Sequence, residues 1–214
     1  MSGYCKSRCC DAACQTTFSI TWATVVVLVM AGCQNADDQL ALAEKYVGDD
    51  KHQEAMEAYD TAIELKPDHA IAYHNRGLLH VKLGQNDKAF SDYDKAIELD
   101  DSFPGAYRDR GRLHLQLNDF EQAIADFSRI LELEPDDSPA FRERGLAYSA
   151  TSQLDKALQD FDKAISLDAK DVGAWQNRGG VHAQLGNSQD ALRDFSKVIE
   201  LKPDDKQAYI DRGT

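Results

Sequence analysis

Arginine and aspartate recur in this sequence at a constant spacing, which makes them the first candidates for chemistry. The positions are Arg76, Arg110, Arg144 and Arg178, and Asp92, Asp126, Asp160 and Asp194. A guanidinium group can hold a carboxylate through two parallel hydrogen bonds. We therefore predict a structural ladder of Arg–Asp ion pairs. Direct contact between these arginines and an acidic ligand is the alternative interpretation.

The six histidines do not form a catalytic or metal-binding pattern. Three of them share one repeat position, at which other repeats carry tyrosine: His80, His114 and His182, against Tyr46 and Tyr148. Replacement by tyrosine indicates packing or hydrogen bonding rather than catalysis. A glycine-rich phosphate loop and a Gly-x-Ser-x-Gly motif are absent from the sequence. The sequence therefore predicts a protein that is not an enzyme and has no cofactor and no metal site.

The overall charge narrows the class of partner. The 214 residues include 24 Lys and Arg and 37 Asp and Glu, giving a net charge of −13. This balance argues against nucleic-acid binding, which needs clustered cations to displace counterions from phosphates. All five cysteines lie at or before Cys33, so we expect no disulfide and no thiolate metal site in the rest of the chain.

Each recurring arginine lies in a repeating unit that is predicted to form two helices. Each arginine is followed by glycine, and an Ala-aromatic pair precedes it, as in Ala72-Tyr73 before Arg76-Gly77. Apolar residues at three- and four-residue spacing predict helices over 70–83 and 87–99, separated by a turn at Gly84. Glycine in the first helix and alanine in the second would let the two helices approach closely. The repeat is 34 residues long, as the spacing from Arg76 to Arg110 shows. A fixed period of this length is typical of a solenoid.

Proline and aspartate mark the ends of several repeats. Pro67, Pro135 and Pro203 are expected to stop one helix. The aspartates that follow them are predicted to cap the next helix: Asp68, Asp136 and Asp204.

The pattern resembles the tetratricopeptide repeat family over residues 36–214, as about five repeats and a partial sixth. The first unit keeps the residues of that family's motif: Leu42-Ala43, Tyr46, Ala55, Tyr59, Ala62 and Pro67. Later units replace the leucine by arginine and the second aromatic by histidine. The resemblance implies an all-α fold, an α-solenoid of stacked antiparallel helix pairs. It also implies a right-handed superhelix with a concave groove lined by the first helices.

The same resemblance places the fifth and ninth repeat positions in the groove. The residues at these positions are His74, Leu78, Arg108, Arg112, Arg142, Leu146, Gln176 and Gly180. We take six of them as candidate groove residues: His74, Leu78, Arg108, Arg112, Arg142 and Gln176. The three arginines form a candidate cluster for an acidic peptide or another carboxylate. The first helices of units two to five carry +6 in total and the second helices −6, which favours a groove less acidic than the outer surface. A solvated face without a ligand is the alternative.

Residues 1–32 predict a signal peptide. Lys6 and Arg8 precede an uncharged run from Ala12 to Ala36, and Met30-Ala31-Gly32-Cys33 resembles the cleavage motif of bacterial lipoproteins. This resemblance implies lipidation, such as palmitate, on Cys33, with residues 33–37 as a short linker. Gln34 favours the outer membrane, with the repeats on its periplasmic face. An uncleaved transmembrane anchor and a cytoplasmic protein with a spurious leader are the alternatives.

Together these observations predict a non-enzymatic interaction scaffold. The repeats would bind peptide segments or partner proteins, outside the cytoplasm and attached to a membrane. Assistance in the assembly of an envelope complex is the role we expect. A transmembrane-anchored adaptor in a regulatory or signalling complex is the second hypothesis.

Overall fold

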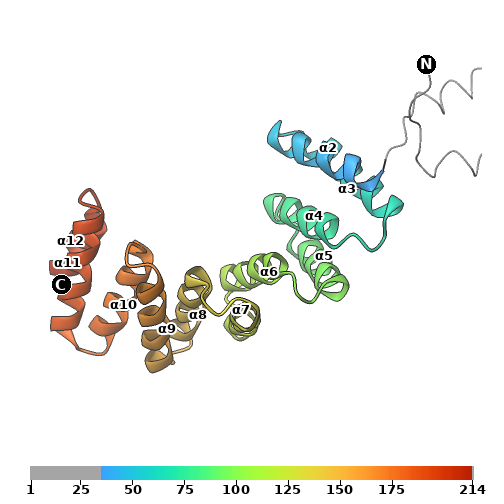
Figure 1. The fold of residues 1–214 in the computed structure, drawn as a ribbon. Helices are drawn as coiled ribbons and strands as arrows, with labels where there is room; N and C mark the ends of the chain where they lie inside the picture. The colour runs from blue at the N-terminus through green and yellow to red at the C-terminus, as the bar shows by residue number, and fades with distance from the viewer. Residues whose placement is uncertain (1–34, 214) are drawn as a thin grey trace, which may run out of the picture. The chain divides into compact units, whose positions relative to one another are not determined.

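The computed structural model describes residues 35–213, and within them it contains eleven α-helices and no strand (Figure 1). The chain divides into two compact units, with the boundary between Pro67 and Asp68. The described part of the first unit consists of α2 (Ala36–Gly48) and α3 (His52–Leu65). The second unit comprises α4 (Ala70–Lys82), α5 (Asn86–Leu99), α6 (Pro104–Leu117), α7 (Phe120–Leu133), α8 (Ser138–Ala150), α9 (Leu154–Leu167), α10 (Val172–Gln184), α11 (Ser188–Leu201) and α12 (Lys206–Gly213).

Within each unit, helices that follow one another in sequence pack as hairpins. The first helix of each pair contacts its own second helix, and in the second unit each second helix also contacts the next first helix. This arrangement confirms the predicted all-α solenoid. The expected helix limits are also close: the segment predicted over 70–83 is α4, which ends at Lys82.

Each complete hairpin turns at a residue with positive φ. These residues recur with the same spacing as the arginines: Asp50, Gly84, Asn118, Ser152 and Gly186. Glycine and asparagine adopt the left-handed region at little cost. The turn signal was therefore visible at Gly84, whereas Ser152 shows that the repeat imposes the same conformation on a less suitable residue.

The prediction for the helix caps was wrong by one residue. Asp137, and not Asp136, caps α8, and its side chain accepts a hydrogen bond from the backbone N–H of Ala140. Asp171 caps α10 in the same way through Ala174. The chain turns directly after each second helix and needs one further extended residue before the next helix begins, so the capping position moves one residue along.

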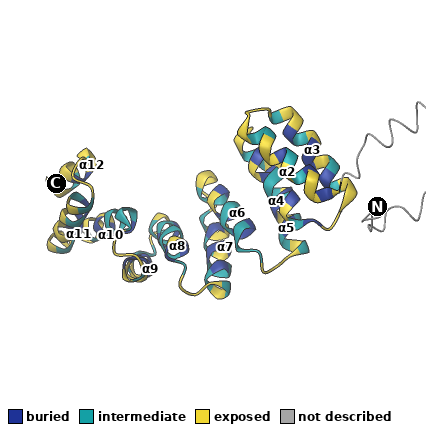
Figure 2. Ribbon diagram, turned by 45° about the horizontal axis from the view of Figure 1, so that its top comes forward, coloured by how far each residue is buried: buried dark blue, intermediate teal, exposed yellow. Residues whose placement is uncertain are grey.

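The predicted close approach of glycine and a large side chain is present in the four complete repeats of the second unit. A Cβ atom on Gly77 would lie 2.7 Å from Tyr93, and one on Gly145 would lie 2.7 Å from Phe161. These rings are fully buried. Figure 2 marks the buried residues of each helix in dark blue. Because real Cβ atoms do not approach a ring so closely, only glycine fits these positions without a shift of the partner helix.

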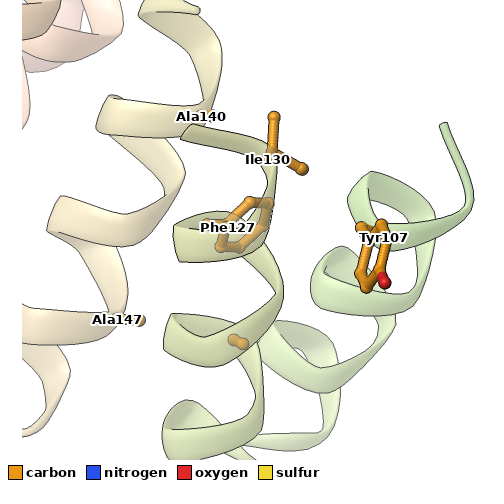
Figure 3. Close-up of a cluster of buried hydrophobic side chains, with 6 residues drawn as sticks. Tyr107, Phe127, Ile130, Ala140 and Ala147 are labelled. Atoms are coloured by element: carbon orange, nitrogen blue, oxygen red, sulfur yellow. The ribbon is translucent and has the colours of Figure 1, made fainter. Parts of the chain in front are cut away.

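One cluster of buried side chains joins three successive helices (Figure 3). Tyr107 comes from α6, Phe127 and Ile130 from α7, and Ala140 and Ala147 from α8. The small alanines of α8 let it lie against the large side chains of α7. Each second helix is therefore shared between two repeats, which makes the packing continuous along the second unit.

Among residues 35–213, no helix has the length and apolarity needed to cross a membrane. Cys33 and the predicted signal peptide over residues 1–32 lie outside the described residues.

Candidate functional site

The recurring arginines and aspartates lie opposite each other within each hairpin. In all four repeats the arginine of the first helix donates from Nε and Nη2 to the two oxygens of an aspartate on the second helix. The N–O distances are 2.9 and 2.6 Å for Arg76–Asp92, 3.0 and 2.6 Å for Arg110–Asp126, 2.8 and 2.8 Å for Arg144–Asp160, and 2.8 and 2.7 Å for Arg178–Asp194. Each pair is therefore bidentate and fixes one hairpin.

Three of these arginines also reach back to the preceding repeat. Nη1 of Arg110 donates to Asp94 at 2.6 Å, and Nη1 of Arg178 donates to Asp162 at 2.5 Å. The corresponding acceptor for Arg144 is the hydroxyl of Ser128, at 3.1 Å. The guanidinium group of one first helix thus forms hydrogen bonds to the second helices on both sides of it. Arg110 of α6, for example, binds Asp94 on α5 and Asp126 on α7.

Ion pairing offsets the burial of the ladder arginines. Asp126, the partner of Arg110 at 2.6 Å, has only 5% of its side chain exposed. Burial alone would lower the pKa of Arg110, but the hydrogen bonds and charges of Asp126 and Asp94 outweigh it and raise that pKa. For Arg178, the hydrogen bond to Asp194 is the largest cause of a raised pKa. The ladder arginines use their donors inside the protein, which favours the structural interpretation over ligand contact.

A second set of charged residues lies where the first helices meet one another. The helices α4, α6, α8 and α10 touch in that order. We call the predicted groove residues on these helices, together with the acidic Asp109 and Glu143, the first-helix face: His74, Leu78, Arg108, Asp109, Arg112, Arg142, Glu143 and Gln176.

Two of the predicted groove arginines are bound by helix caps. Arg108 donates to Asp137 at 2.5 and 3.3 Å, and Arg142 donates to Asp171 at 2.7 Å. These aspartates are the ones that cap α8 and α10. Each carboxylate therefore accepts hydrogen bonds from a backbone N–H at the start of a helix and from an arginine side chain.

The pKa of Asp137 shows the result of this double role. Burial raises the pKa of its carboxyl, but the hydrogen bonds from Arg108 and from the backbone N–H of Ala140 outweigh burial, and the net shift is downward. Asp137 is thus held as a carboxylate beside Arg108.

The remaining charges form a chain across the face. His74 Nε2 lies 2.8 Å from a carboxylate oxygen of Asp109, and the other oxygen of Asp109 lies 3.8 Å from Arg112. Arg112 is 3.5 Å from Glu143, which also accepts from Arg142 at 3.2 Å. Acidic side chains therefore separate the three arginines, and the face is not a free cationic patch.

The predicted groove residues differ in accessibility. The side chain of Arg112 is 44% exposed, against 21% for Arg108 and 26% for Arg142. Leu78 is exposed, whereas His74 is buried against the rings of Tyr93 and Phe103. Gln176 is half-buried.

Sequence reasoning missed the acidic partners of this face. They are Asp109, Asp137, Glu143 and Asp171. A signal was present, because Asp137, Asp171 and Asp205 also share one repeat position. In the part of the chain that the structure describes, no group of three or more histidine, cysteine or acidic side chains could hold a metal ion.

Four models of one repeat family match the sequence. A model described as TPR repeat matches residues 46–84, and three described as tetratricopeptide repeat match 70–103, 108–172 and 172–205. The chain is a tetratricopeptide repeat protein. These TPR matches follow one another over most of the second unit and include part of the first. No curated protein sequence is significantly similar to the chain.

Solved TPR structures share this fold at low sequence identity. YrrB, described as a TPR protein with an unusual peptide-binding site, is 23% identical with a TM-score of 0.75, covering 88% of this chain and 97% of its own. MamA from Desulfovibrio magneticus RS-1 is 21% identical with a TM-score of 0.74, covering 80% and 97%. Pseudomonas aeruginosa pilF is 16% identical with a TM-score of 0.72, covering 82% and 80%.

Proposed function

We propose that this TPR protein is a non-enzymatic scaffold that binds a peptide segment of a partner protein along its first-helix face. One observation carries the proposal: exposed apolar side chains of α4 and an exposed cationic side chain of α6 stand on first helices that contact each other. Ile71 and Leu78 are 47% and 40% exposed on α4, and Arg112 is exposed on the adjacent α6. A partner could bury the leucine and isoleucine and pair with the arginine.

The ladder supports this proposal because it fixes the position of each first helix. Every arginine from Arg76 to Arg178 binds an aspartate of its own hairpin through two hydrogen bonds. A rigid face costs less entropy on binding than a mobile one. The peptide-binding site named for YrrB also supports a peptide as the kind of partner.

Affinity capture followed by mass spectrometry tests the proposal. The purified chain is compared with an Ile71→Ser/Leu78→Ser variant, which makes the exposed part of α4 polar. We expect specific partners with the wild type and a loss of at least tenfold with the variant. Arg193→Ser is the matched control, because Arg193 is 73% exposed on the second helix α11. Equal recovery by all three proteins would contradict the proposal.

We further infer that the scaffold is a lipoprotein of the cell envelope, anchored through Cys33. The motif Met30-Ala31-Gly32-Cys33 supports this proposal, as does the start of α2 at Ala36, shortly after Cys33. Lys6 and Arg8 before the apolar run favour repeats outside the cytoplasm. The periplasmic face of the outer membrane is the location that Gln34 favours, and assistance in the assembly of an envelope complex is the proposed role.

The intact mass of the membrane-bound protein tests the anchor. A lipoprotein has lost residues 1–32 and carries acyl chains on Cys33, and Cys33→Ser prevents both changes. An intact leader in the wild type would instead support the second candidate, a transmembrane-anchored adaptor in a regulatory complex. The uncharged run from Ala12 to Ala36 is the observation that favours this alternative.

A further inference from the structure

The helix α10 carries two adjacent glycines directly after its ladder arginine. They are Gly179 and Gly180, whereas in α4, α6 and α8 the residue after the glycine is leucine or arginine. Gly179 has a packing role, because a Cβ atom there would lie 2.9 Å from the ring of Phe195. At Gly180 no described atom of another helix lies within 4 Å of the Cβ position. The second glycine therefore weakens the helix without improving its packing.

The weakening acts on the end of α10. Glycine regains more backbone freedom than any other residue when a helix opens. In a helix interior, glycine in place of alanine favours opening by about fivefold. Because α10 ends at Gln184, only the short segment after Gly180 is affected.

The ladder holds the preceding part of α10. Arg178 donates to Asp194 at 2.8 and 2.7 Å, and to Asp162 at 2.5 Å. These bonds attach α10 to the second helices on both sides of it, α9 and α11. An opening of the helix end can therefore stop at the glycine pair, because it does not need to break the ladder.

The end of α10 also lacks a side-chain hydrogen bond that the end of α4 has. Nδ1 of His80 lies 2.8 Å from Oε1 of Gln85, across the turn to α5. His182 occupies the same repeat position, but its buried Nδ1 has no hydrogen-bond partner among the described residues. A buried nitrogen without a partner loses its hydration, and opening of the helix end restores that hydration.

We propose that residues 179–187 are a conformational device of the fold, a segment that opens and closes locally while the rest of the second unit stays folded. Val181 is the buried apolar side chain of this segment, and it packs with Ala157 and Phe161 of α9. Opening moves Val181 into water and uncovers part of this cluster. The opened protein therefore presents an apolar surface that the closed protein lacks.

Hydrogen exchange of the full chain under native conditions, followed by mass spectrometry, tests the inference. Amides of residues 181–187 should exchange at least fivefold faster than those of 147–153, the equivalent segment of α8. Gly180→Ala should slow exchange in 181–187 about fivefold and leave α4 to α9 unchanged. Gly48→Ala on α2 is the matched control, because no described atom of another helix lies within 4 Å of its Cβ position either. This control should leave α10 unchanged.

A second variant reproduces the glycine pair in another repeat. Arg112→Gly places a glycine directly after Gly111, where the described residues accept only one hydrogen bond from Arg112, at 3.5 Å. Exchange in residues 113–119 should become about fivefold faster. No effect of this variant would overturn the glycine pair as the cause of opening.

Two further outcomes would overturn the local opening itself. One is exchange in residues 181–187 that is no faster than in 147–153. The other is equal slowing of all helices of the second unit by Gly180→Ala, because exchange would then require unfolding of the whole unit.

Discussion

Each aspartate of the ladder is buried and pairs with the arginine of its own hairpin. Replacing Asp126 by Asn leaves the half-buried Arg110 without a carboxylate on its own hairpin. We expect the free energy of unfolding to fall by about 3 kcal/mol, because the guanidinium loses its buried counter-charge. Urea denaturation measures the loss. Asp136→Asn, at an exposed site 3.5 Å from Lys163, should change stability by less than about 0.5 kcal/mol.

A double variant separates the pair from its individual members. Arg110→Met with Asp126→Leu removes both charges, and we expect it to be more stable than Asp126→Asn alone. If the double variant is instead the less stable protein, hydrogen bonding and not charge compensation dominates at this position.

Acid sensitivity provides a second prediction for a single residue. Because the pKa of Asp137 is lower in the folded protein, its contribution to stability is complete above the ordinary value of 3.8. That contribution is lost as the pH falls through the lower folded value. Asp137→Asn should therefore lose less stability than the wild type when the urea midpoint is compared at pH 6 and pH 3. If Asp137→Asn and the exposed control Asp136→Asn lose the same stability between pH 6 and pH 3, the shifted pKa of Asp137 has no consequence for folding.

At this scale the sequence predicted the residues of the ladder but not the state of the groove arginines. Identical spacing between the arginine and the aspartate in units two to five, as between Arg76 and Asp92, left few arrangements open. The binding of Arg108 by Asp137 depends on where α8 begins, and the expected cap was misplaced by one residue. The charge of +6 that the sequence gives for the first helices also included the ladder arginines. The aspartates of the second helices neutralise these arginines, so they do not contribute to the charge of the groove.

The distance between the two helices of a hairpin depends on the glycine of the first helix. Gly145→Ala would bring a Cβ atom to 2.7 Å from Phe161, whose ring is fully buried. We expect a loss of about 1–3 kcal/mol from overpacking, although alanine favours helix by about 1 kcal/mol. Thermal or urea denaturation measures the change, and Phe161→Leu in the same chain should restore part of it.

Gly180 is the matched control on a neighbouring repeat. It lies in the same type of helix, is exposed, and has no described atom within 4 Å of the place that a Cβ atom would take. Gly180→Ala should therefore stabilise the protein by up to about 1 kcal/mol. If Gly180→Ala also destabilised the protein, close contact at the Cβ position would not explain the difference expected between Gly145 and Gly180.

Helix limits and helix pairing could be read from the sequence because Gly84 marks the turn between α4 and α5, and the apolar spacing that marks these two helices recurs in the other repeats. The contacts between successive first helices could not. They depend on side-chain direction, and Asp109 and Glu143 are neighbours of the predicted groove residues in sequence but had no assigned partner.

At the scale of the whole molecule, the ladder is not uniform. The first unit carries Leu42 and Ala58 at the positions of the arginine and the aspartate. We predict that backbone amides of α2 and α3 exchange hydrogen faster than those of α6 to α9, because each hairpin of the latter helices contains a bidentate arginine–aspartate pair. Hydrogen exchange followed by mass spectrometry measures the difference.

An engineered pair tests the cause of that difference. Leu42→Arg with Ala58→Asp introduces the missing partners and should slow exchange in α2 and α3. Leu42→Arg alone, which adds a cation without its carboxylate, should not. Equal protection of both units in the wild type would contradict the prediction.

The links from Arg110, Arg144 and Arg178 to the second helices on both sides have a consequence for how the array can grow. Arg110 finds Asp126 on the helix ahead and Asp94 on the helix behind, and Arg178 does the same with Asp194 and Asp162. An in-frame tandem duplication of one whole repeat would therefore meet suitable acceptors at both new junctions. The length of the array, and with it the length of peptide that it can accommodate, can thus change in one genetic event without compensating substitutions.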